Sequence, residues 1–191
     1  MPSFRVPTFR VPSDVADAES IQDELRKHLI VPSSPIEEPR TAVGVDVTYE
    51  VNSDRAMAAA VGRLAAPPPL IVCDGYGLAH PRRFGLACHL GLLLDVPAFG
   101  VAKTPFIGEA ADPDRDRGEF TDLTDNGEVI GRAVRTQSNV KPVFVSAGHR
   151  IGLADSTTLA VRLSSRYRIP EPTRQADILS RRALRELAGN G

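Results

Sequence analysis

The chain has 191 residues, of which 42% are apolar and 25% are charged, and this composition is typical of one globular domain rather than two. Two cysteines are too few for a disulfide framework or a thiolate zinc site, and no apolar stretch approaches the 18 residues of a membrane span. Because no signal-type apolar segment lies near its start, the chain is expected to be cytoplasmic and to have no membrane partner. The net charge of −1 indicates nothing about nucleic acid until it is divided by position.

The first third of the chain predicts a tail, a helix and a strand. Residues 1–13 contain Phe-Arg-Val-Pro twice, and prolines at this spacing predict a flexible tail ahead of a single domain over 14–191. Apolar residues at 21, 25 and 29 predict an amphipathic helix over 14–29. A proline-rich connector leads to a predicted strand over 41–51, whereas residues 56–64 fit either a strand or a short helix.

The middle of the chain predicts a β-α-β unit. Residues 70–73 form a continuous apolar run, which is typical of a strand that is covered on both faces. A helix is predicted from Pro81, which suits a first helical position, to about Leu94. A second buried strand follows over 97–102, and the connection between the two strands is expected to be right-handed.

The last third of the chain completes an α/β domain. Here the pattern predicts a loop over the acidic stretch 108–126, strands over 129–136 and 142–146, and helices over 155–165 and 173–187. Thr173 is the expected N-cap of the last helix. Strands and helices mixed in this order predict a central mixed sheet flanked by helices.

Basic residues gather in this last third. Residues 132–186 hold eleven Lys or Arg against four Asp or Glu. Such a surplus is typical of a surface that contacts phosphates, but arginines on solvated helix faces explain it equally well.

Two aspartates stand in apolar surroundings. Asp46 lies in the middle of an apolar strand segment, and Asp74 ends the buried strand and is followed by two glycines within three residues. A carboxylate in such a position is costly unless it is paired or binds a cation. If the two strands are neighbours, the carboxylates can share Mg²⁺; the alternative is a salt-bridged Asp46 and a cap or turn aspartate at 74.

Polar groups follow Asp74 and the next strand. Gly75 and Gly77 permit close approach of a backbone, and His80 can exchange a hydrogen bond with a phosphate or a water. Lys103 ends the strand over 97–102. Because ligand groups gather beyond the carboxyl ends of strands in an open α/β sheet, Asp74 and Lys103 are expected at the same edge.

Several segments resemble one known family. They are DGYGLAHPRRFGLA at 74–87, DVPAFGVAK at 95–103, VSAGHRI at 145–151 and RIPEPTRQAD at 168–177. Together with VDV at 45–47, they are similar to endonuclease V, in order, from about residue 20 to residue 187. The resemblance implies a ribonuclease H-like fold and a DNA-repair nuclease that depends on Mg²⁺, with Mn²⁺ as a substitute. It also implies nicking of DNA or RNA near inosine, the product of adenine deamination.

The resemblance also implies residue roles. It assigns catalytic roles to Asp46, Asp74, His80, Lys103 and Asp177, with Asp46 and Asp74 as metal ligands and the lysine as a phosphate clamp. The expected nucleic-acid contacts are Gly75, Tyr76, Gly77, Arg82, Arg83, His149, Arg150 and Arg174. No obligate protein partner is expected.

The chain departs from the family pattern in two places. Tyr76 stands where the family has histidine, and only 28 positions separate Asp46 from Asp74, far fewer than in the family. The missing part is a proline-glycine segment that ends in Phe-Arg-Glu and carries the third catalytic acid, with a Pro-Tyr wedge that separates strands nearby. Glu50 lies four residues after Asp46 and hence on the same face of the strand, but about 13 Å along it, which is too far to share one ion unless the strand bends sharply. Asp54 and Glu109 have no supporting context.

The leading hypothesis is therefore a metal-dependent endonuclease of the endonuclease V type. One alternative is a catalytically degenerate member that binds nucleic acid or a partner without cleavage. Another is a nuclease of altered specificity, because the wedge is missing.

Overall fold

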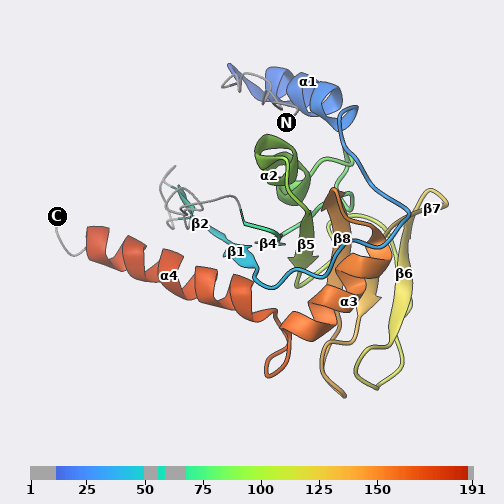
Figure 1. Cartoon of the computed structure of the whole chain (residues 1–191). Helices are drawn as coiled ribbons and strands as arrows, with labels where there is room; N and C mark the ends of the chain where they lie inside the picture. The colour runs from blue at the N-terminus through green and yellow to red at the C-terminus, as the bar shows by residue number, and fades with distance from the viewer. Residues whose placement is uncertain (1–11, 50–55, 59–67, 189–191) are drawn as a thin grey trace.

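A six-stranded sheet forms the centre of the molecule (Figure 1). The computed structural model describes residues 12–49, 56–58 and 68–188. In spatial order the strands are β1 (Val43–Val45), β4 (Ile71–Asp74), β5 (Ala98–Ala102), β8 (Val143–His149), β7 (Glu128–Val134) and β6 (Phe120–Asp125). The first three strands are parallel, and the other three continue the sheet in antiparallel pairing. This arrangement confirms the predicted α/β domain with a mixed sheet.

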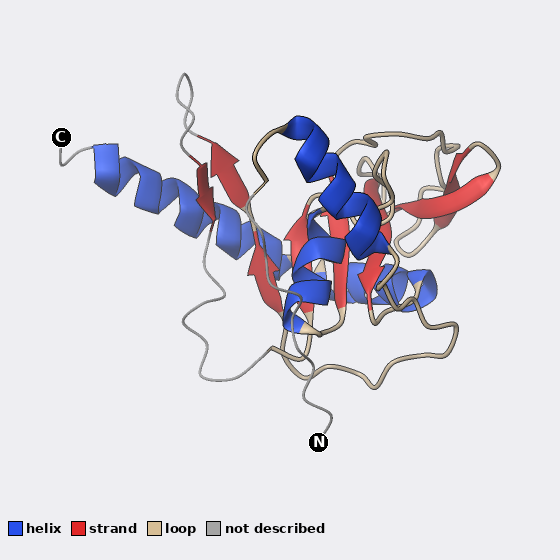
Figure 2. Ribbon diagram, turned by 90° about the horizontal axis from the view of Figure 1, so that it is seen from above, coloured by secondary structure: helices blue, strands red, loops and turns tan. Residues whose placement is uncertain are grey.

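Helices cover both faces of this sheet (Figure 2). On one face, α2 (Leu86–Leu94) packs against side chains of β4 and β5 such as Ile71 and Ala98. On the other face, α3 (Leu153–Leu163) packs against Val72 and Val101. The fourth helix, α4 (Glu171–Ala188), runs alongside β1 on that same face. The continuous apolar runs of β4 and β5 are buried because each of these strands has helices on both sides.

The N-terminal helix α1 (Val15–Arg26) agrees with the predicted amphipathic pattern but ends earlier than expected. Asp14 caps it, since its side chain accepts a hydrogen bond from the backbone N–H of Asp17 at 2.8 Å. Leu25 and Leu29 pack against a buried cluster around Phe84. The apolar stripe therefore attaches α1 and the turn after it to the outside of α2.

The strand predicted over 41–51 is two strands. The chain leaves the six-stranded sheet at Asp46, and β2 (Val47–Tyr49) pairs with β3 (Ala56–Ala58) in a separate two-stranded antiparallel sheet. The first part of the ambiguous segment 56–64 is therefore a strand, and residues 59–64 lie outside the described residues. A continuous β-branched pattern cannot reveal this break, because both strands have the same local preference.

Helix α2 begins at Leu86, five residues later than predicted, and the assignment of Pro81 as its first residue was wrong. Residues 75–85 form a loop that crosses the sheet, where the N–H of Leu78 donates to the carbonyl of Ala147 at 2.7 Å. The N–H of Gly85 donates to Gly77 at 3.0 Å. The hydrogen bond to β8 and the one within the loop together outweigh the local helix preference of the segment.

The acidic stretch 108–126 is not entirely a loop, because it contains β6. This strand pairs with β7 through a turn at Asn126 and Gly127, whose φ angles are 51° and 81°. An Asn-Gly pair with positive φ is a strong hairpin signal, and it outweighs the acidic composition that favoured a loop.

Smaller differences concern the last elements. Strand β8 extends to His149, three residues beyond the prediction, and α4 begins at Glu171 instead of after Thr173. The hydroxyl of Thr173 donates to the carbonyl of Pro170 at 2.9 Å, so this residue lies in the first turn and is not the cap. The predicted tail lies outside the described residues, apart from Pro12 and Ser13. No described helix combines the length and apolar character that a membrane crossing requires.

The contact between β1 and α4 leads to a stability prediction. A Cβ on Gly44 would overlap the backbone carbonyl of Pro172 and lie 2.6 Å from the N of Thr173, so the start of α4 would have to move. We expect Gly44→Ala to reduce the free energy of unfolding by about 2–3 kcal/mol, as measured by urea denaturation. Ser20→Ala on the exposed side of α1 is the control, and an equal effect of both substitutions would contradict the close contact.

Candidate active site

The candidate site is built on two aspartates at the ends of neighbouring strands. Strands β1 and β4 are parallel, with Val45 opposite Cys73, so Asp46 and Asp74 follow side by side at the carboxyl end. Adjacent strands lie about 4.8 Å apart, and paired residues point to the same face. Because Cys73 faces α2, its successor Asp74 faces the α4 side, as Asp46 does. The strands are thus neighbours, as the predicted shared site requires.

Asp46 is buried and accepts a hydrogen bond from a residue of α4. The residue is 7% exposed, and its Oδ2 accepts a hydrogen bond from the hydroxyl of Ser180 at 2.8 Å. The same hydroxyl is 3.0 Å from the carbonyl oxygen of Asp177, one turn earlier on the helix. Asp177, the predicted catalytic acid of the last helix, therefore lies on the helix face that packs over the strand-end aspartates.

Asp74 is paired with a lysine from the next strand. The Nζ of Lys103 is 2.9 Å from Oδ2 of Asp74, which confirms that the two residues share one edge of the sheet. The position of Lys103 is fixed by Arg168, whose guanidinium donates to the carbonyls of Lys103 at 2.9 Å and Pro142 at 2.7 Å. Burial lowers the pKa of Arg168. This arginine stabilises the end of β5, although the sequence gives no local signal of its role.

A second cation faces the aspartates from α4. The Nε of Arg181 is 2.6 Å from Oδ1 of Asp177, four residues earlier on the helix. The hydrogen bond to Asp177 raises the pKa of Arg181, and the charges of Asp177, Asp46 and Asp74 raise it further. All three predicted acids are therefore within electrostatic reach of this one guanidinium.

The loop after Asp74 lies flat against the sheet, and its glycines are required there. A Cβ on Gly77 would overlap the carbonyl of Ala147, and a Cβ on Gly100 would lie 2.5 Å from the carbonyl oxygen of Gly75. The N–H of Gly77 also donates to the hydroxyl of Ser146 at 2.8 Å. Of the two glycines predicted to approach nucleic acid, Gly77 thus has a packing role, whereas Gly75 has open space around it and a positive φ of 144°. Contact of either with nucleic acid stays a prediction.

An aromatic group lies beside this loop. The ring centroids of Tyr76 and His80 are 5.3 Å and 5.5 Å from that of Phe106, which is 54% exposed. The hydroxyl of Tyr76 donates to the carbonyl of Thr104 at 3.2 Å. This contact lies next to Lys103 in the sequence and keeps the loop near the end of β5.

His80 has a defined hydrogen-bonding state. Burial lowers its pKa, and the charge of Arg82 lowers it further, so the imidazole is neutral at pH 7. Its Nδ1 accepts a hydrogen bond from the backbone N–H of Arg82 at 3.2 Å. In a neutral imidazole with an accepting Nδ1, the proton is on Nε2. His80 can therefore donate a hydrogen bond from Nε2.

The two arginines after His80 are held by acids. Arg82 pairs with Glu19 and with Asp23 of α1, the latter at 2.9 Å. Arg83 pairs with two acids of the β6–β7 hairpin, Asp125 at 2.7 Å and Glu128 at 2.8 Å. These ion pairs attach the loop to α1 and to the hairpin. Their proposed contacts to nucleic acid stay predictions.

His149 and Arg150 lie away from the aspartates. The register places His149 opposite Ala98, at the amino end of β5, whereas Lys103 follows the carboxyl end. His149 is 1% exposed and its Nε2 is 3.3 Å from Oδ1 of Asp95, while Arg150 donates from Nε to the same oxygen at 2.5 Å. The structure therefore does not bring His149 and Arg150 to the strand ends where Asp46 and Asp74 lie.

Arg174 lies in the first turn of α4 and is also paired. Its guanidinium binds both carboxylate oxygens of Glu171, at 2.8 Å and 2.7 Å, and stacks over the ring of Tyr167. These hydrogen bonds and one from Gln175 lower the pKa of Glu171 to about 2. Arg174 is only partly exposed, and its role in binding nucleic acid stays a prediction.

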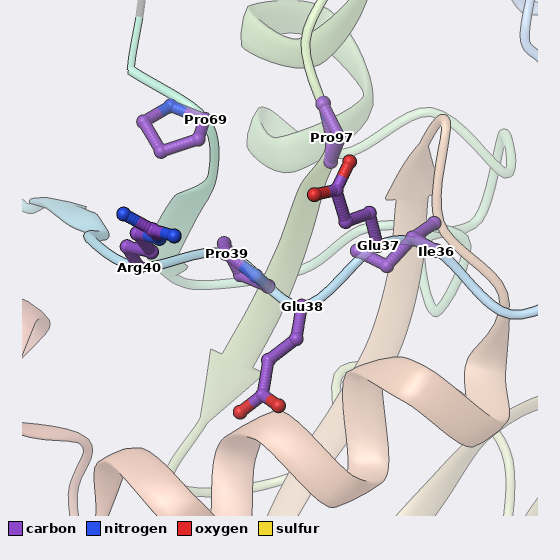
Figure 3. A pocket seen from close by; sticks show the side chains of 7 residues that line it. All are labelled: Ile36, Glu37, Glu38, Pro39, Arg40, Pro69 and Pro97. Carbon is purple, nitrogen blue, oxygen red and sulfur yellow. The ribbon is translucent and has the colours of Figure 1, made fainter.

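A hollow of about 470 Å³ lies at the amino ends of the strands, opposite the carboxyl ends that carry Asp46 and Asp74 (Figure 3). It is lined by Ile36, Glu37, Glu38, Pro39, Arg40, Pro69 and Pro97. Two of these prolines come shortly before β4 and directly before β5, so the hollow opens at the amino ends of the strands. It is therefore separate from the aspartate site.

The oxygen donors that could hold a metal ion are Asp46 and Asp74. Across residues 12–49, 56–58 and 68–188, no group of three or more His, Cys, Asp or Glu side chains is arranged to hold an ion. Of the proposed replacements for the missing acid, Glu50 and Asp54 lie outside these residues. Glu109 forms a β-bridge with Thr124 of β6, at the far side of the sheet from β1.

Three histidines lead to a prediction for the pH dependence of stability. Burial lowers the pKa of His80, His89 and His149 below the ordinary value of 6.5. Below pH 6.5 the unfolded chain therefore binds more protons than the folded chain, and stability falls as the pH falls. We expect urea denaturation to give a lower free energy of unfolding at pH 5.5 than at pH 7.5. Part of this difference should disappear in His149→Gln, whereas exposed His28→Gln should retain all of it.

Comparison with known proteins identifies the family. The family described as Endonuclease V matches residues 55–178. The Endonuclease V of Streptomyces coelicolor is 42% identical over 219 aligned residues, which cover 93% of this chain and 94% of the relative. Since this chain has only 191 residues, at least 28 of the aligned positions have no counterpart here.

Solved structures agree with this match. The crystal structure of the Endonuclease V of Streptomyces avermitilis has a TM-score of 0.87 and 40% identity, and the likeness covers 96% of this chain and 98% of the other. The fold of the Ciona intestinalis Endonuclease V is also similar, with a TM-score of 0.69 and 24% identity over 90% of this chain and 98% of the other. This chain belongs to the endonuclease V family, and it is an endonuclease with a ribonuclease H-like fold.

Proposed function

We propose that this endonuclease nicks DNA or RNA near inosine and requires a divalent cation, Mg²⁺ with Mn²⁺ as a substitute. The main support is the register of β1 and β4, which brings two carboxylates side by side at the edge that also carries Lys103. The Ciona intestinalis protein, whose fold is similar, was crystallised with a DNA that contains an inosine followed by a ribo-adenosine. A substrate of that kind is therefore the first to test.

The donor set suits a hard divalent cation. Asp46 and Asp74 present carboxylate oxygens on one face of neighbouring strands, and Mg²⁺ is usually held by one or two carboxylates together with water and substrate phosphate. These two residues would hold the ion, which when bound supplies positive charge beside the phosphate. The loss of the third acid leaves fewer negative charges than in the family pattern, so we expect weaker affinity for the ion.

The chain's own residues supply the remaining functions. Lys103 places a positive charge at the edge where a phosphate would lie, and Nε2 of His80 can donate a hydrogen bond to a phosphate oxygen. Hydrolysis forms a bond between a water oxygen and phosphorus and breaks one phosphorus–oxygen ester bond. The water loses a proton and the departing oxygen gains one. Asp177 lies over the same edge and is the candidate to accept the proton from water.

A second candidate function is binding without cleavage. The observation that favours it is the short spacing between Asp46 and Asp74, since the resemblance implies that the segment missing there carries the third acid and the wedge. Both candidates predict binding to nucleic acid. Only the first predicts a nicked product.

The first test is cleavage of an inosine oligonucleotide by the full chain. We expect Mn²⁺ to support more nicking than Mg²⁺, because Mg²⁺ requires a nearly ideal octahedral set of ligands and gives up water reluctantly. Asp74→Asn should reduce nicking at least 100-fold, since it removes one of two ligand charges. Lower selectivity for inosine over adenine than the family pattern implies is also expected, because the wedge is absent.

Asp116→Asn is the matched control, because it removes the same charge from an exposed loop and should leave nicking unchanged. Absence of nicking with either ion, together with retained binding of the oligonucleotide, would favour the binding-only candidate. Efficient nicking with Mg²⁺ would mean that another acid completes the site, and Glu50→Gln would then identify or exclude the nearest one in sequence.

The second test is the salt dependence of DNA binding. Phosphate contacts release counterions, so the affinity should fall steeply and linearly on a log–log plot against salt concentration. We expect Lys103→Ala to reduce the slope by about 1, because one phosphate contact is lost. Arg150→Ala should leave the slope unchanged, since Arg150 lies near the amino end of β5, whereas Lys103 follows its carboxyl end. Equal effects of the two substitutions would contradict the location of the binding edge.

A further inference from the structure

The feature that the proposed function leaves unused is Arg181. It lies on α4, which runs alongside β1 (Figure 1), and its Nε is 2.6 Å from Oδ1 of Asp177. The preceding residue, Ser180, donates to Asp46. Consecutive residues of one helix turn thus contact the predicted acid on the helix and the acid at the end of β1.

The charges around this turn nearly balance. Asp46, Asp74 and Asp177 carry three negative charges, while Lys103 binds Asp74 and Arg181 binds Asp177. Arg181 also interacts electrostatically with Asp46 and Asp74. Without the two cations, the negative charges that act on Arg181 would face one another uncompensated and would repel one another.

We propose that Arg181 is a built-in counter-cation of the aspartate site, and that a divalent cation held by Asp46 and Asp74 binds there against the positive charge of Arg181. The inference depends on the proposed metal requirement. It adds a residue that sets the affinity for the ion rather than another ligand.

Coulomb's law gives the size of the effect. A single positive charge about 7 Å from a divalent cation in a water-like medium changes the binding constant by roughly five- to tenfold. The side chain of Arg181 is 63% exposed, so salt should reduce the effect and substitution should leave no cavity. Because the guanidinium also pairs with Asp177, substitution of Arg181 by glutamine removes its positive charge and leaves the negative charge of Asp177 uncompensated by this ion pair.

The experiment measures Mn²⁺ affinity of the full chain by isothermal titration calorimetry at low and at high salt, without nucleic acid. We expect Arg181→Gln to bind Mn²⁺ about five- to tenfold more tightly than the parent chain at low salt, and the difference to shrink at high salt. Arg181→Lys should stay within about twofold of the parent, because the charge is retained while the hydrogen-bond geometry changes.

Arg185→Gln is the matched control. It removes the same charge from the same helix one turn farther on, and it should change the affinity by less than about twofold. Thermal unfolding of each variant separates a charge effect from a loss of folding, because a merely structural role for Arg181 would lower the melting temperature and leave the affinity for Mn²⁺ unchanged.

The outcomes separate the two proposals. If the parent chain binds Mn²⁺ and Arg181→Gln binds it equally or more weakly, Arg181 is not a counter-cation and the metal requirement still stands. If neither the parent chain nor Arg181→Gln binds Mn²⁺ at millimolar concentration, the metal requirement itself is wrong, and the inference fails with it. Tighter binding by Arg181→Gln and Arg185→Gln alike would show a general effect of net charge and would also overturn the inference.

Discussion

The parallel pairing of β1 with β4 is the contact on which the site depends. It brings Asp46 and Asp74, which are 28 positions apart in the sequence, to adjacent strand ends and onto one face. A shift of the register by one residue would turn one of the two side chains to the opposite face. Helix α4 also contacts β1 closely, because Gly44 has no side chain and the start of α4 can lie directly against the strand.

The loop between Asp74 and α2 is the second constraint on the site. It crosses β5 and β8 so closely that glycine is required at 77 and 100, and it continues to the β6–β7 hairpin, where Arg83 is held by two acids. The basic residues of this loop are therefore engaged within the protein. His80 remains in this loop, neutral and able to donate from Nε2, and its ring centroid lies 5.5 Å from that of Phe106.

The charges of the site explain how three acids coexist around the guanidinium of Arg181. Lys103 and Arg181 each bind one carboxylate, and Ser180 donates to another. Each of these partners is supplied by a different element from the acid it serves, except for the pair Asp177 and Arg181 on α4. The arrangement suits a site in which a phosphate and a cation exchange with the protein's own charges, as we propose for this endonuclease.

Local patterns in the sequence determined most of the elements and the identity of the acids. Apolar runs mark β4 and β5, the i, i+4 spacing marks α1, and the isolated carboxylates at 46 and 74 mark the site, because burial of an unpaired charge is costly wherever it occurs. Only the tertiary structure decided where the strand around Asp46 breaks, where α2 begins and which residues support the site. The break, the late start of α2 and the contacts from Arg168, Ser180 and Arg181 all depend on partners far away in the sequence, and a local pattern contains no information about such partners. The same reason applies to His149 and Arg150, which lie in a segment that resembles the family. Because β8 runs antiparallel to β5, these residues lie at the opposite end of the strands from the aspartates, and the residues around them in the sequence do not reveal that direction.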